Sequence, residues 1–114
     1  MVVSGVLGKK KKQLQAVIKR IVDTIAPEKI ILFGSAAKNN MDKANDLDLL
    51  VVNNSDQNSH LTGDIYESLH GMERPPVDVI VVTEKEYQRD KDVFGTLIHQ
   101  AHRESKVVYS KNNE

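Results

Sequence analysis

The chain has 114 residues, with 16 basic and 16 acidic side chains, so its formal net charge is zero. This balance gives no whole-protein field that would favour nucleic acid as a partner. The absence of cysteine excludes a disulfide framework and a cysteine metal site, and no apolar run reaches the roughly 18 residues of a membrane span.

The spacing of apolar and turn-forming residues predicts alternating helices and strands. Apolar steps of three and four indicate helices, branched runs indicate strands, and Gly, Pro and Asn indicate breaks. In chain order we expect a helix over 13–25, a strand over 30–33, a helical turn from 35, a strand over 46–52, a helix over 60–70, a strand over 77–82, a short helix from 83, a last helix over 94–102 and an edge strand over 106–109.

Three local details accompany this prediction. Thr83 and Glu86 have the spacing of a capping box, Gly71 closes the middle helix, and the last helix turns Leu97, Ile98 and Ala101 inward. The alternation favours an α/β fold, a small mixed β-sheet flanked by helices. We expect a single cytoplasmic domain over residues 1–114, with flexible ends at 1–8 and 110–114.

Gly34 and Ser35 follow the first predicted strand and open a helical turn. Glycine lets the backbone turn tightly and approach a ligand closely, and unpaired N–H groups at a helix start attract phosphate. A serine hydroxyl there can donate to a phosphate oxygen, and Lys38 lies one turn later. Taken alone, the pair also fits a capping serine after a turn glycine, with Lys38 simply exposed.

Asp46 and Asp48 are two residues apart on a predicted strand, so both side chains point to one face, with Cα atoms about 6.7 Å apart. Asp78 stands inside the apolar strand 77–82, where a carboxylate without a partner is costly. If these strands are neighbours, the three acids converge and offer the hard oxygen ligands that suit Mg²⁺ or Mn²⁺. Separately, each acid also fits a solvated position at a strand end.

Other polar residues give weaker indications. Lys9–Lys12 fit a solvated helix face better than a phosphate grip. The histidines lack ligand spacing with a carboxylate and fit structural roles, and the tyrosines are too sparse for a nucleic-acid stacking platform. These residues are His60, His70, His99 and His102, and Tyr66, Tyr87 and Tyr109.

The segments 32–38, 45–51 and 77–79 together resemble the minimal nucleotidyltransferases of the DNA polymerase beta superfamily. That family has Gly-Ser-x-Ala-Arg-Gly, then Ser-Asp-x-Asp-Leu, then a third acid on a later strand, and here the segments read LFGSAAK, NDLDLLV and VDV. Lys38 replaces the family's arginine, so a forked guanidinium contact becomes a point charge. Asn39 replaces the family's glycine. Asn45 replaces the serine.

The resemblance implies a polymerase beta-like fold and a Mg²⁺-dependent transfer of a nucleoside monophosphate, AMP from ATP, to a hydroxyl with release of pyrophosphate. It implies that Asp46 and Asp48 hold two metal ions, that Asp78 holds one of them and helps to deprotonate the acceptor, and that Gly34 and Ser35 hold the β- and γ-phosphates. Mn²⁺ is the alternative metal.

The resemblance also implies a partner, because the chain is too short for a large acceptor-binding domain. Many such proteins resemble antitoxins that transfer AMP to a tyrosine of a helical HEPN-type toxin. Three alternatives stay open: the catalytic half of a two-subunit enzyme, a homo-oligomer, and a non-catalytic module that binds nucleotide or a partner. The departures at Lys38 and Asn39 keep this last alternative open.

Overall fold

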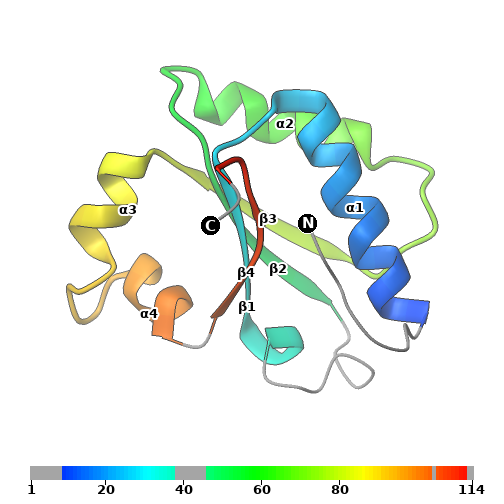
Figure 1. Cartoon of the computed structure of the whole chain (residues 1–114). Helices are drawn as coiled ribbons and strands as arrows, with labels where there is room; N and C mark the ends of the chain where they lie inside the picture. The colour runs from blue at the N-terminus through cyan, green and yellow to red at the C-terminus, as the bar shows by residue number, and fades with distance from the viewer. Residues whose placement is uncertain (1–8, 38–45, 104, 113–114) are drawn as a thin grey trace.

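Residues 9–37, 46–103 and 105–112 are described by the computed structural model, and they form a four-stranded sheet with helices on both faces (Figure 1). The strands are β1 (Lys29–Phe33), β2 (Leu47–Val52), β3 (Val77–Val82) and β4 (Ser105–Ser110). Their order across the sheet is β3-β2-β1-β4, with β1 antiparallel to β2 and β4, and with β2 parallel to β3. The expected mixed α/β sheet is therefore confirmed.

Two pairs of helices cover opposite faces of this sheet (Figure 1). They are α1 (Lys9–Ile25) and α2 (Asn58–Ser68) on one face, and α3 (Glu84–Asp90) and α4 (Leu97–Arg103) on the other. Because α2 connects the parallel strands β2 and β3, it fills the crossover that such a pair requires. A four-residue 3₁₀ turn, η1 (Gly34–Ala37), follows β1.

The larger core lies between the sheet and the helices α1 and α2. The predicted apolar stripe of α1 is buried, with Val17 and Ile21 fully covered, and it packs on alternate residues of β2 such as Leu49. Ile65 and Leu69 of α2 join the same cluster. Burial of such side chains contributes about 1.5–3 kcal/mol each before the entropic cost of folding.

The smaller core lies on the opposite face and packs α3 and α4 against the sheet. Leu50 and Val52 of β2 and Val82 of β3 meet Tyr87 and Ile98 there. Successive strand residues point to opposite faces, so Leu50 and Val52 share their face with Asp48. Asp48 therefore lies on the same face of the sheet as the smaller core.

Local signals at element ends are confirmed. Gly71 follows α2 with φ 79°, and the Thr83 side chain caps α3 in a reciprocal capping box with Glu86. Several element bounds differ from the expectation by one to four residues: α1 begins at Lys9 and not at 13, Asp46 precedes β2, and α2 covers 58–68. The proposed tail at 1–8 lies outside the described residues.

The prediction for the last helix is wrong in part. α4 begins at Leu97, because the chain turns at Gly95 with φ 93°. Leu97 therefore falls in the first turn and is 54% exposed, whereas Ile98 and Ala101 are buried as expected. No helix within the described residues is both long and apolar enough to span a membrane.

Candidate functional site

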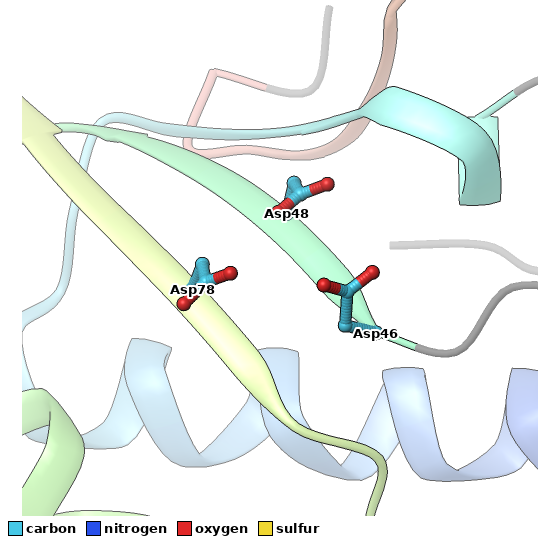
Figure 2. Close-up of side chains that lie close together, drawn as sticks. All are labelled: Asp46, Asp48 and Asp78. Carbon is cyan, nitrogen blue, oxygen red and sulfur yellow. The ribbon is translucent and has the colours of Figure 1, made fainter.

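Three aspartates meet at one end of the sheet. Asp46 stands immediately before β2, Asp48 is the second residue of β2, and Asp78 is the second residue of β3. The parallel register pairs Asp48 directly with Asp78. One carboxylate oxygen of each residue lies within 4.8 Å of those of the others, and Figure 2 shows the three side chains gathered over the two strands.

The alternation of β2 and β3 explains why these acids share a face. Leu47 and Leu49 point into the larger core, so Asp48 between them points to the opposite face. The same holds for Asp78 between Val77 and Val79. Asp46 and Asp48 are half-buried and Asp78 is exposed, so the cluster is open to solvent on one side.

The electrostatics of the cluster are those of mutually repelling carboxylates. Partial burial raises the pKa of Asp48, and the neighbouring charges of Asp46 and Asp78 raise it further, as does a side-chain hydrogen bond with Asp78. Within residues 9–37, 46–103 and 105–112, no basic side chain forms an ion pair with these acids. A cation placed between them would relieve the repulsion.

Gly34 lies against this cluster because β1 and β2 pair Phe33 with Asp48. Its φ is 75°, a left-handed backbone conformation, and a Cβ built on it would overlap Asp48 Oδ2. The carboxylate thus occupies the space that any larger residue would fill. The group that lies beside Gly34 is Asp48, whereas the expected close approach of a phosphate to this glycine stays a prediction.

The remaining residues of the predicted phosphate grip are only partly described. Ser35 is the second residue of η1, so the expected helical turn after Gly34 is confirmed for the backbone. Lys38, Asn39 and Asn45 lie outside the described residues.

Three of the four histidines have described side-chain contacts, and none of these contacts is with the acid cluster. His99 Nδ1 lies 2.7 Å from the carbonyl oxygen of Lys91, and His102 Nδ1 lies 2.6 Å from the hydroxyl of Tyr87. His60 is exposed and lies 3.8 Å from Asp64. Among the acids and histidines that the structure describes, it is the three aspartates that lie close enough together to hold a metal ion.

One hollow elsewhere on the molecule is separate from this cluster. It has a volume of about 420 Å³ and is lined by Lys12, Gln13 and Ala16 of α1 and by Glu73. Since α1 covers the face opposite the acids, this hollow adds nothing to their site.

Sequence reasoning missed a contact of Tyr66 beside the cluster. The Val79 backbone N–H, next in the chain to Asp78, donates to the Tyr66 hydroxyl at 2.8 Å. The contact joins an α2 side chain to the outer edge of β3. No spacing rule predicts it, because it depends on how α2 packs on the sheet.

Comparisons with known proteins agree with this geometry. A family model described as polymerase beta, nucleotidyltransferase matches residues 15–114. The solved structure of a candidate nucleotidyltransferase from Sulfolobus solfataricus superposes with a TM-score of 0.55 over 93% of this chain and 92% of that one, at 21% identity, which shows a shared fold. No curated protein sequence matches significantly. Because the family model covers nearly the whole chain, the chain belongs to the polymerase beta nucleotidyltransferase family.

Proposed function

We propose that this nucleotidyltransferase depends on a divalent metal and transfers AMP from ATP to a hydroxyl acceptor, with release of pyrophosphate. The observation that carries the proposal is the convergence of Asp46, Asp48 and Asp78 beside Gly34, on a sheet end open to solvent. Hard carboxylate oxygens at this spacing fit Mg²⁺, with Mn²⁺ as the alternative.

The three acids have different proposed roles. Asp46 and Asp48 would each help to hold two metal ions, and Asp78 would help to hold the ion nearer the acceptor. The raised pKa of Asp48 supports this assignment, since the clustered charges lack a basic partner among the described residues. Divalent cations held there would neutralise charge on the triphosphate and favour ionisation of the acceptor hydroxyl.

Asp78 is also the proposed base for the acceptor. It is the most exposed of the three acids, so a hydroxyl arriving from solvent reaches it first, and its carboxylate takes the hydroxyl proton. The acceptor oxygen then forms a bond to the α-phosphorus, and the bond from that phosphorus to the oxygen leading to the β-phosphate breaks. AMP is left on the acceptor, and pyrophosphate leaves.

Gly34, Ser35 and Lys38 are the proposed contacts of the β- and γ-phosphates. Gly34 supports this role because it leaves room for Asp48 directly beneath the start of η1, so phosphates bound there lie next to the acids. Positioning and charge neutralisation then supply most of the rate.

The proposed acceptor is a tyrosine of a helical HEPN-type toxin, which makes this chain an antitoxin. The open end of the sheet supports a macromolecular acceptor, because Asp78 is exposed at an edge strand. A second subunit that binds a small-molecule substrate is the alternative source of the hydroxyl, and a second copy of this chain is another.

The test is label transfer from ATP labelled at the α-phosphate, with Mg²⁺ and a lysate of the native host. We expect a labelled acceptor with the wild type, and none with Asp48→Asn. Asp56→Asn is the matched control, since Asp56 is an exposed acid in the loop after β2, and it should label as the wild type does. Undiminished labelling by Asp48→Asn would contradict the assignment.

The same assay separates catalysis from simple binding. ATP and Mg²⁺ binding without any labelled product would identify a non-catalytic module instead. Mass spectrometry of a labelled acceptor would identify the modified side chain, and a small-molecule product would exclude the toxin tyrosine.

A further inference from the structure

The outer edge of β3 carries an unusual side-chain contact next to Asp78. β3 is an edge strand, and edge strands leave backbone N–H groups without a strand partner. Here the Val79 N–H donates to the Tyr66 hydroxyl at 2.8 Å. The peptide unit that contains this N–H begins at the carbonyl carbon of Asp78, so the contact restrains the backbone at the acid.

Tyr66 is held in place by a well-packed helix. Its neighbour Ile65 and, one turn later, Leu69 are fully buried in the larger core. Arg20 of α1 also donates to the carbonyl oxygen of Ser68 at 2.5 Å, which joins the end of α2 to α1. The packing of α2 therefore holds the Tyr66 backbone in place while its hydroxyl contacts β3, although the whole residue is 40% exposed.

The position of the Asp78 carboxylate depends on the β3 backbone more than the position of the Asp48 carboxylate depends on that of β2. Asp48 lies on an interior strand and against Gly34, whereas Asp78 is exposed on the edge strand. The side chains described beside it are those of Asp46 and Asp48, acids of the same cluster that repel it when charged. The direction of the Asp78 carboxylate is therefore set chiefly by the position of β3.

We infer that Tyr66 is a positioning residue for Asp78: its hydroxyl fixes the β3 backbone so that the Asp78 carboxylate meets those of Asp46 and Asp48. This inference rests on the proposed role of Asp78 as a metal ligand. Tyr66 belongs to α2, on the face of the sheet opposite the acids, and it is not one of the family's motif residues. The inference gives this side chain an influence on the site.

The test compares Tyr66→Phe with the wild type by two readouts that need no turnover. Amide exchange at Val79, measured by NMR, should accelerate about fivefold, the factor that corresponds to one net hydrogen bond. The Mn²⁺ dissociation constant, measured by electron paramagnetic resonance of the free ion, should rise about tenfold, as for loss of a partner that orients a ligand.

Two further variants separate positioning from general loosening. Tyr87→Phe removes a hydroxyl that bonds His102 on the α3 and α4 face, and it should leave Mn²⁺ affinity unchanged. In an Asp78→Asn background, Tyr66→Phe should weaken Mn²⁺ binding no further, because a positioning residue acts through the acid that it positions.

Several outcomes would overturn the inference. These are unchanged exchange at Val79, unchanged Mn²⁺ affinity despite faster exchange, and an undiminished effect in the Asp78→Asn background. A wild type that does not bind Mn²⁺ would overturn it together with the metal site. A wild type that binds Mn²⁺ without transferring AMP would defeat the proposed transfer alone and leave the positioning result intact.

Discussion

Replacing Gly34 by alanine tests whether the site needs the close approach of this glycine to Asp48. Gly34 has φ 75°, and an added Cβ would overlap Asp48 Oδ2. The substitution should have two separable effects: a backbone cost from the left-handed conformation, and a displacement of the Asp48 carboxylate from the other two acids.

The backbone cost can be isolated with a second glycine. Gly95 has φ 93°, and a Cβ there would meet nothing within 4 Å. An L-residue in a left-handed conformation costs about 1–2 kcal/mol, which in a domain of this size lowers the melting temperature by about 4–8 °C. Both Gly34→Ala and Gly95→Ala should show this loss in thermal unfolding monitored by circular dichroism.

Only Gly34→Ala should also disturb the metal site. Its Mn²⁺ affinity should fall about 10- to 100-fold, the range for losing the support of a metal ligand, whereas Gly95→Ala should bind as the wild type does. Titration of Mn²⁺ against each folded variant measures this difference. Wild-type affinity in Gly34→Ala would refute the claim that this close approach places Asp48.

Four further predictions follow from described contacts. Asp48→Asn should stabilise the metal-free protein by about 1–2 kcal/mol in urea unfolding, because each neighbouring charge within 4.8 Å repels by about 1 kcal/mol in a solvent-exposed setting; a less stable variant would count against mutual repulsion. Because folding raises the pKa of Asp48, the protonated carboxyl group favours the folded state. This contribution to stability is fully present below the unfolded pKa near 3.8 and is lost as the pH rises through the folded pKa. The gain from Asp48→Asn should therefore shrink on acidification from about pH 7 to pH 4, and a constant gain would contradict this linkage. Thr83→Ala should cost about 1 kcal/mol of unfolding free energy, because it removes the hydroxyl that caps α3, and an unchanged melting temperature would argue against the cap. Leu97→Gln should change stability by less than about 0.5 kcal/mol, whereas Ile98→Ala should cost about 2–4 kcal/mol, since they are 54% and 7% exposed; equal losses would contradict the described placement of α4.

Local sequence signals predicted much of the fold because several segments have one dominant pattern. The apolar stripe of α1 matches the helical period, and the short run of branched residues in β3 favours a strand. The capping box at Thr83 depends only on neighbouring residues. The start of α4 was predicted three residues early, because the conformation of Gly95 is not specified by apolar spacing.

The members of the carboxylate cluster could be predicted because Asp46 and Asp48 are close in sequence and Asp78 interrupts an apolar strand. Their convergence depended on β2 lying beside β3, a long-range pairing that the structure supplies. The fit of Gly34 against Asp48 and the contact of Tyr66 with Val79 also join distant segments. Such contacts arise from packing, so no local pattern indicates them.

A crystal structure with Mn²⁺ and a non-hydrolysable ATP analogue tests the central claim most directly, because the anomalous signal of manganese locates each ion independently. We predict manganese directly coordinated by oxygens of Asp46, Asp48 and Asp78, with the β- and γ-phosphates beside Gly34 and Ser35. Manganese bound elsewhere, or nucleotide bound with Asp78 turned away from any ion, would contradict the proposed metal site.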